Sequence, residues 1–304
     1  MSPLIALAVV AGLIGQAPID RTVVATIDNE AVHASQVLNE INQAYRDKKL
    51  TEEARGAVLE RAREQVIDRH LVLRYLTRTG QAASSQDVDF ALAQLEKQLT
   101  SQGITLKDHC QRIGLEVADV RSLLAWKLSW NGYVEKHLTD QNLEKYFLLH
   151  KRDFDGTQIR VSQILLKPEG AGDQAAVDAA VARAEKLRGE IAGGKLSFAE
   201  AARVHSTAPS GKKGGDIGII SRHEPMPDDY SRAAFALEVG QISPPLVTSY
   251  GVHLLTATEI KPGTKTWQDV RSELKEAVTL YLFKWITERE RPIAKIVLTE
   301  DWPQ

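Results

Sequence analysis

The chain has little that would cross-link it, charge it strongly or bind a metal ion. Its one cysteine, Cys110, has no partner for an intrachain disulfide, so the fold depends on packing alone. Lys and Arg total 38 against 40 for Asp and Glu, which gives no electrostatic reason to expect nucleic acid as a partner. The eight histidines lack metal-site spacing, and the sequence contains neither a Gly-x-Ser-x-Gly nor a His-Glu-x-x-His pattern. A hydrolase is not indicated, and neither a metal nor a cofactor is expected.

One apolar run, Leu4–Ile14, lies near the start of the sequence. Its length matches the hydrophobic part of a secretory signal and is short for a membrane span. Gly15 and Ala17 are small residues suited to a cut after Ala17, although no Lys or Arg precedes the run and Pro18 would follow the cut. We expect residues 1–17 to be a signal peptide and the protein to be exported to the periplasm or another extracytoplasmic space. A leader that is not cleaved would instead tether the chain to the membrane.

The chain of 304 residues is long enough for two domains, and residues 22–154 are predicted to form a helical one. Apolar residues recur every three or four positions over Thr51–Thr79, and Gly80 is a natural stop. A short strand, Val23–Ile27, comes first, and Ser35 can cap the helix that follows it. The other predicted helices cover residues 86–102, 105–113, 120–134 and 141–150.

The sequence pattern changes near residue 155, where glycine, proline and short β-branched runs appear. We predict a second domain over residues 155–262, in the order strand, helix, helix, strand, helix, strand, strand. Ser197 and Glu200 form a capping box that begins its second helix. The predicted strands cover residues 159–166, 214–220, 246–248 and 252–260, and the helices 174–191, a short one from 198 and 228–237.

The last segment, residues 263–304, contains one predicted helix, Trp267–Glu290, and a terminal strand, Ile293–Leu298. These elements have no core of their own, so we expect them to return to the helical domain. Residues 296–298 would then pair with Val23–Ile27, which makes the middle domain an insertion. The predicted fold class is α+β.

Six short motifs in the middle domain resemble those of one family. They are RVSQIL (160–165), SFAEAA (197–202), HS (205–206), GGDIG (214–218), FAL with GQIS (235–237 and 240–243), and YGVH (250–253). The segment from about Thr157 to Glu259 resembles a parvulin-type peptidyl-prolyl isomerase domain. This resemblance implies a four-stranded antiparallel-type sheet flanked by helices. The whole chain is similar to bacterial chaperones of the survival-protein-A type, in which N-terminal helices and a returning C-terminal helix form a chaperone domain that carries a parvulin domain.

The resemblance also implies an apolar socket for a proline ring. The socket residues would be Ile217, Met226 and Tyr230, with Phe235 behind them and Tyr250 at a further substrate-binding position. The family usually has Phe where this chain has Tyr230, so the ring is kept and a hydroxyl is added. The alternative interpretation is that these apolar residues are ordinary core residues.

The polar half of the site departs from the family pattern. His253 matches the histidine of the last strand, and Thr248 matches the hydroxyl residue before it. Gln163 stands where the family usually has a histidine in the first strand, and Ala208 stands where it usually has Cys or Asp. Gln163 can donate and accept hydrogen bonds but cannot carry charge, and Ala208 supplies no polar group. The catalytic candidates are therefore His253, Gln163 and Thr248, in a depleted site.

Two functions fit these residues. The first is a peptidyl-prolyl cis-trans isomerase and chaperone with weakened catalysis, acting on unfolded exported polypeptides that contain X-Pro bonds. The second is a non-catalytic holdase whose parvulin-like domain only binds peptides. No arginine cluster follows the first strand at Lys167, so we expect no requirement for phosphorylated substrates. The sequence leaves the oligomeric state open.

Overall fold

The computed structural model describes residues 19–45, 51–170, 173–299 and 302. The predicted leader lies outside this part of the chain. The chain forms two compact units, which are residues 1–139 with 279–304 (unit 1) and residues 140–278 (unit 2). None of the described helices is both long enough and apolar enough to cross a membrane.

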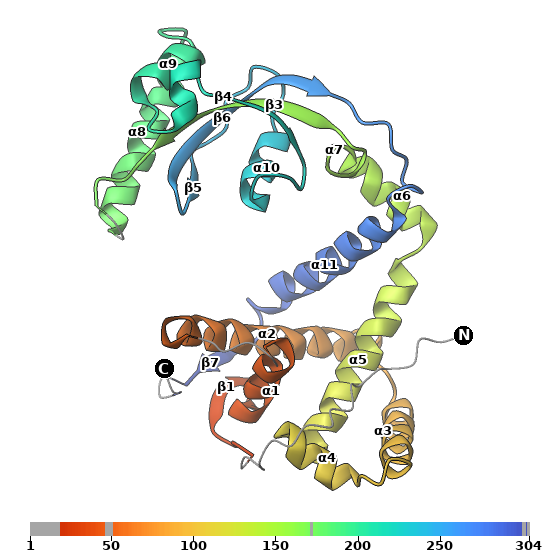
Figure 1. Cartoon of the computed structure of the whole chain (residues 1–304). Helices are drawn as coiled ribbons and strands as arrows, with labels where there is room; N and C mark the ends of the chain where they lie inside the picture. Colours follow the sequence, from red (N-terminus) through yellow and green to blue (C-terminus); the bar gives the residue numbers. More distant parts are fainter. Residues whose placement is uncertain (1–18, 46–50, 171–172, 300–301, 303–304) are drawn as a thin grey trace. The chain divides into compact units, whose positions relative to one another are not determined.

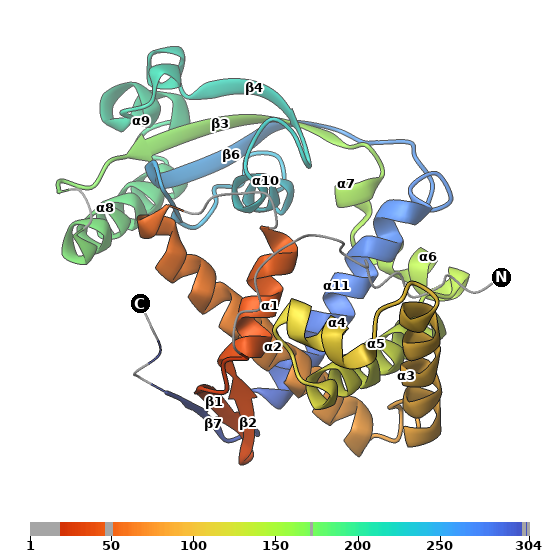
Figure 2. The same cartoon turned by 60° about the horizontal axis from the view of Figure 1, so that its bottom comes forward.

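Unit 1 contains a three-stranded antiparallel sheet in the order β2-β1-β7 (Figure 2). Its strands are β1 (Val23–Ile27), β2 (Glu30–His33) and β7 (Ile296–Leu298). Asp28 and Asn29 turn the chain between β1 and β2 with positive φ angles of 49° and 74°, which these residue types tolerate well. The predicted pairing of residues 296–298 with β1 is confirmed, whereas β2 was not predicted.

Five helices of unit 1 precede the other unit in the sequence, and their caps explain their starts. Thr51, Ser84 and Thr105 each accept a backbone N–H at a helix N-terminus. The prediction that Ser35 caps the first helix is wrong, because His33 is the N-cap residue and the Ser35 hydroxyl is buried without a hydrogen-bond partner among the described residues. The helices are α1 (Ala34–Ala44), α2 (Glu52–Arg78), α3 (Ser85–Thr100), α4 (Leu106–Ile113) and α5 (Val117–His137).

The C-terminal helix α11 (Arg271–Glu290) ends in unit 1 on a buried ion pair. Glu290 is only 1% exposed and pairs with both Arg74 and Arg78 of α2. The ring of Trp285 on the same helix meets Tyr75 edge to face at 5.9 Å between centroids. The predicted return of the C-terminal helix to the N-terminal helices is thus seen in these contacts. The helix begins four residues later than predicted, because Thr266 and Asp269 form a turn before it.

Unit 2 is built on a four-stranded antiparallel sheet in the order β4-β3-β6-β5 (Figure 1). Its strands are β3 (Gln158–Leu166), β4 (Asp216–Ser221), β5 (Leu246–Thr248) and β6 (Gly251–Lys261). Its helices are α6 (Asp140–Leu149), α7 (Lys151–Phe154), α8 (Gln174–Ala192), α9 (Phe198–His205), α10 (Asp228–Phe235) and a 3-10 turn, η1 (Pro209–Lys213). The predicted sheet and its flanking helices are confirmed.

Alternation along the two central strands separates two cores. Ile164 of β3 and Leu254 of β6 pack with α8 and α9 on one face of the sheet. Val161 of β3 and Leu255 of β6 pack with α10 on the opposite face. Because side chains along a strand alternate between faces, the residues at 163 and 253 point to the α10 side. This face carries the predicted site.

Candidate active site

His253 and Gln163 come from the two central strands of unit 2. Leu165 is the pairing partner of His253, and Gln163 lies two residues earlier on the same face. This diagonal arrangement brings the Nδ1 atom of His253 to 3.1 Å from the Oε1 atom of Gln163. The structure therefore brings together two predicted residues that are 90 positions apart in the sequence.

The side chains continue into a four-residue hydrogen-bond network. Tyr230 of α10 donates its hydroxyl proton to Gln163 Oε1 at 3.1 Å. On the other side, Thr248 Oγ1 lies 2.9 Å from His253 Nε2. Because Gln163 Oε1 is an acceptor, His253 donates from Nδ1–H. The Thr248 hydroxyl has one proton, which can go either to His253 Nε2 or to the Gly251 carbonyl oxygen 3.3 Å away. A neutral imidazole satisfies both of its contacts when that proton goes to Nε2.

Burial favours the same protonation state. His253 is 5% exposed, and burial lowers the pKa of its imidazole below the usual value of 6.5. Tyr230 is 2% exposed, and burial raises the pKa of its phenol, which remains a hydrogen-bond donor at neutral pH. The two rings meet edge to face at 5.5 Å between centroids. The network is therefore uncharged.

Gln163 retains donor groups that the network does not use. Its Oε1 atom accepts from both Tyr230 and His253, while no described residue accepts from its Nε2–H groups. A carboxamide has two such donors. The network thus orients a side chain whose remaining N–H groups are available to a ligand.

The apolar candidates gather next to this network. Tyr230 and Phe235 of α10 belong to the buried core on this face of the sheet, and Ile217 and Met226 pack against it while staying partly exposed. Tyr250 is 69% exposed in the turn between β5 and β6, and only its backbone N–H enters the network, by donating to Thr248 Oγ1 at 3.1 Å. Ile217 and Met226 are thus the members of the set that combine apolar packing with access to solvent.

The loop after α9 supports the first strand but adds no polar side chain to the network. Ala208 is buried, and the neighbouring Thr207 donates both its N–H and its hydroxyl proton to the Leu165 carbonyl at 2.8 and 3.0 Å. Ser206 Oγ accepts the Leu165 N–H at 3.1 Å. The interpretation of Ala208 as a lost polar position agrees with this geometry, in which the adjacent hydroxyl is used by the backbone.

Gly215 allows the chain to approach Gln163 closely. The Gly215 carbonyl accepts the Gln163 N–H at 2.9 Å, and the glycine has a φ of +89°. A Cβ atom there would lie 2.5 Å from the Gln163 carbonyl oxygen. Only glycine fits such a position. The GGDIG motif pointed to Gly215 in the sequence, but the close contact of Gly215 with Gln163 is seen only in the structure.

No group of three or more His, Cys, Asp or Glu side chains suited to a metal ion occurs within the described ranges. The side chains that the structure brings together at this site are hydrogen-bonding and apolar ones. Sequence reasoning missed the role of the Tyr230 hydroxyl as a donor to Gln163. The added hydroxyl itself was the signal.

Comparison with known proteins agrees with this geometry. Residues 164–259 match the family model described as Rotamase, a PPIC-type PPIase domain. The chain is 34% identical over 116 residues to the peptidyl-prolyl cis-trans isomerase Pin1 of Malus domestica, which covers 34% of this chain and 95% of that protein. It is 30% identical over 141 residues to the foldase protein PrsA of Bacillus subtilis (46% of this chain, 41% of PrsA). It is 26% identical over 245 residues to the chaperone SurA of Alkalilimnicola ehrlichii (78% of this chain, 56% of SurA).

The chain thus spans about half the length of the foldase and chaperone relatives, but nearly all of the small isomerase. The isomerase match covers nearly the whole of that protein, and the family match over residues 164–259 contains His253 and begins one residue after Gln163. Through this domain the chain belongs to the PPIC-type, or parvulin, family of peptidyl-prolyl cis-trans isomerases.

Proposed function

We propose that unit 2 isomerises X-Pro peptide bonds in unfolded or extended polypeptides, and that the whole chain is an exported foldase. The observation that carries the proposal is the network of Tyr230, Gln163, His253 and Thr248 beside a partly exposed apolar set. The similarity to Pin1, PrsA and SurA supports polypeptides as the substrate class.

The chemistry needs no nucleophile. Rotation about a peptide bond has a barrier of roughly 18–20 kcal/mol because twisting breaks the amide resonance. In the twisted state, charge leaves the carbonyl oxygen and a lone pair returns to the proline nitrogen. A donor aimed at that nitrogen stabilises the twisted state more than the planar one. The free Nε2–H groups of Gln163 are the donors we assign to this role, with His253 and Tyr230 as the residues that hold the carboxamide in place.

The apolar set would accept the proline ring. Ile217 and Met226 are the partly exposed walls, and the Tyr230 and Phe235 rings lie behind them. A proline ring bound there loses water, which disfavours the planar and more polar form of the amide. Substrate choice would then depend on the ring rather than on charge, and phosphorylated substrates would not be required.

The replaced polar residues set the expected rate. Gln163 keeps hydrogen bonding but not charge, and Ala208 contributes no hydrogen bond. Each hydrogen bond lost from such a site costs about 1–3 kcal/mol, or roughly a ten- to hundredfold loss in rate. We therefore expect a weak isomerase. The same substitutions favour the second candidate function, a holdase in which the parvulin domain only binds peptides.

A comparison of His253→Ala with His205→Ala in the full chain distinguishes the two functions. His205 lies exposed on α9 and serves as the matched control. Isomerisation of a proline tetrapeptide is followed in a protease-coupled assay, and aggregation of an unfolded protein is followed by light scattering. The foldase proposal expects His253→Ala alone to slow isomerisation while aggregation suppression stays unchanged. If the wild-type protein does not accelerate isomerisation above the uncatalysed rate, the foldase proposal fails and only the holdase function remains.

A further inference from the structure

The loop between β4 and α10 carries one wall of the apolar set that would accept the proline ring. Met226 in this loop packs against the buried core on the α10 side of the sheet and stays partly exposed. Residues 223–225 and Pro227, on either side of Met226, are exposed. Exposed residues bury little surface that could fix a backbone. The position of the Met226 wall must therefore depend on the few anchored residues of the loop.

Arg222, near the start of the loop, is such an anchor. Its side chain is only 12% exposed although the loop lies at the surface. Its Nη1 atom donates to Asp228 Oδ1 at 2.7 Å. Asp228 is the first residue of α10, so this bond closes the loop across its two ends. Within the closed segment, the Ser231 hydroxyl donates to the Met226 carbonyl at 3.4 Å.

The same guanidinium is held from outside the loop by α7. Its Nε atom donates to Asp153 Oδ1 at 2.8 Å. The helix α7 lies on the same side of the sheet as α10 (Figure 1), and it precedes the residues that match the family model. One largely buried arginine thus bridges two carboxylates, one on α7 and one at the start of α10. Hydrogen bonds between charged partners are stronger than neutral ones, so this bridge is a firm link between α7 and the loop.

The helix α7 is itself fixed to the body of unit 2. Arg152 donates to the Leu237 carbonyl at 3.1 Å and to the Glu238 carboxylate at 2.9 Å. Asp155 follows the helix, and its backbone carbonyl accepts the Lys265 N–H at 3.0 Å. This bond ties the segment that enters the domain to the segment that leaves it. The loop is therefore supported by a helix that is held at both of its ends.

We propose that Arg222 and Asp153 are positioning residues for the proline site. They hold the loop so that Met226 is in place before a proline ring arrives. A wall that is already ordered saves the entropy of ordering it on binding, and the saving appears as tighter binding of the substrate. Gln163 and His253 lie on β3 and β6, outside this loop, so the turnover of bound substrate should not depend on the bridge. The inference rests on the proposed function in taking Met226 as part of the proline site.

Met226 itself provides the structural readout. The sequence has two methionines, Met1 and Met226, so carbon-13 methyl labelling of methionine in the full chain reports directly on this wall, and Met226→Leu assigns its NMR signal. The Asp153→Ala and Arg222→Gln variants should each shift that signal, because the methyl group packs beside aromatic residues of α10 and senses small displacements. The control Glu169→Gln removes an exposed ion pair in another loop of unit 2 and should not shift it.

Kinetics on a proline tetrapeptide give the functional readout. Asp153→Ala and Arg222→Gln should each raise KM about three- to tenfold and leave kcat within about twofold, because they loosen binding and spare the hydrogen-bond network. Asp153→Asn keeps an oxygen that can accept from Arg222, so it should raise KM less than Asp153→Ala. The double variant should match Arg222→Gln alone, since both changes act through one ion pair. A fall in kcat with unchanged KM would overturn the inference, as would an unmoved Met226 signal in Asp153→Ala.

Titration of the Met226 signal with the same tetrapeptide separates this inference from the isomerase, because it measures a dissociation constant without catalysis. If the wild type binds the peptide but does not accelerate isomerisation, and Asp153→Ala weakens binding about three- to tenfold, the positioning role stands and the isomerase fails. If the wild type is active and Asp153→Ala changes neither KM nor the dissociation constant, the isomerase stands and the positioning role fails. A wild type that does not bind the tetrapeptide would refute both.

Discussion

The hydrogen bond between Tyr230 and Gln163 is the part of the site that most needs a direct test. The hydroxyl is buried and donates to Gln163 Oε1, which also accepts from His253. We consider Tyr230→Phe, Gln163→Leu and the double variant. Both substitutions nearly preserve shape, so packing changes little and hydrogen bonding changes most.

The expected free energies follow from which donors lose their acceptor. Tyr230→Phe removes a donor and leaves Gln163 bonded to His253, so it should cost about 0.5–1.5 kcal/mol. Gln163→Leu leaves two buried donors unpaired, the Tyr230 hydroxyl and the His253 Nδ1–H, at about 1–3 kcal/mol each. In the double variant only the imidazole donor is unpaired. The double variant should thus be more stable than the sum of the single costs predicts, by about 1.5–4.5 kcal/mol.

Hydrogen exchange of β3 and β6 peptides, read by mass spectrometry in the full chain, measures the stability of this sheet locally. Each 1.4 kcal/mol corresponds to a tenfold change in protection. When the coupling energy of two substitutions is below about 0.5 kcal/mol, their effects on the free energy of unfolding are additive. A coupling in that range would show that the Tyr230 hydroxyl does not bond to Gln163 in solution, and the assignment of Gln163 as the oriented donor would fail.

Three other perturbations have clear expected outcomes. Gly215→Ala should lower the stability of unit 2 by about 1–3 kcal/mol in thermal unfolding and slow isomerisation, because its Cβ would collide with the Gln163 carbonyl. The control Gly218→Ala, with a φ of +86° but open space around it, should lower the stability less in the same experiment. Since the pKa of His253 is lowered in the fold, the unfolded chain binds the proton first, and the stabilisation present above about pH 6.5 should be lost as the pH falls below that value. The urea midpoint should therefore drop less between pH 7.5 and 5.5 in His253→Gln than in the wild type, and an equal drop would contradict the assignment. Glu290→Gln should lower the stability of unit 1 by about 1–3 kcal/mol in calorimetry, because it removes a buried carboxylate from two arginines, whereas Glu288→Gln at an exposed ion pair should cost under about 0.5 kcal/mol.

Local signals in the sequence determined most of the secondary structure. Apolar spacing of three and four residues predicted the helices of unit 1 to within a few residues of their observed ends, as over Thr51–Thr79 for α2. These signals act within a few residues, so no tertiary information is needed to read them. Ser35 shows the limit, because tertiary packing buried its hydroxyl and moved the N-cap two residues earlier, to His33.

The motifs of the middle segment also determined the family and the candidate residues. They identified His253 and Gln163 as strand residues of a parvulin domain, and the family match over residues 164–259 bears out that resemblance. The roles of those candidates stay predictions until the variants are measured. The sequence indicated a polar site with two altered positions, but not what replaced the missing groups.

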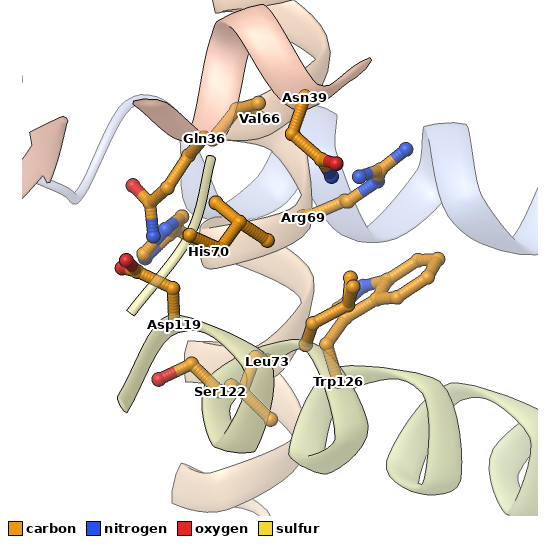
Figure 3. Close-up of a pocket in the computed structure, with 11 residues that line it drawn as sticks. Gln36, Asn39, Val66, Arg69, His70, Leu73, Asp119, Ser122 and Trp126 are labelled. Carbon is orange, nitrogen blue, oxygen red and sulfur yellow. The ribbon is translucent and has the colours of Figure 1, made fainter. Parts of the chain in front are cut away.

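Only the tertiary structure decided how the altered site is organised. Tyr230 lies 67 residues from Gln163, and α10 had to pack on one particular face of the sheet before its hydroxyl could reach the carboxamide. A pocket of unit 1 (Figure 3) has the same origin, because its lining comes mainly from α1, α2 and α5 and it exists only after those helices pack. Burial, pairing and cavities are properties of contacts between distant segments. The sequence therefore determines these contacts, but they cannot be read from the order of residues along the chain.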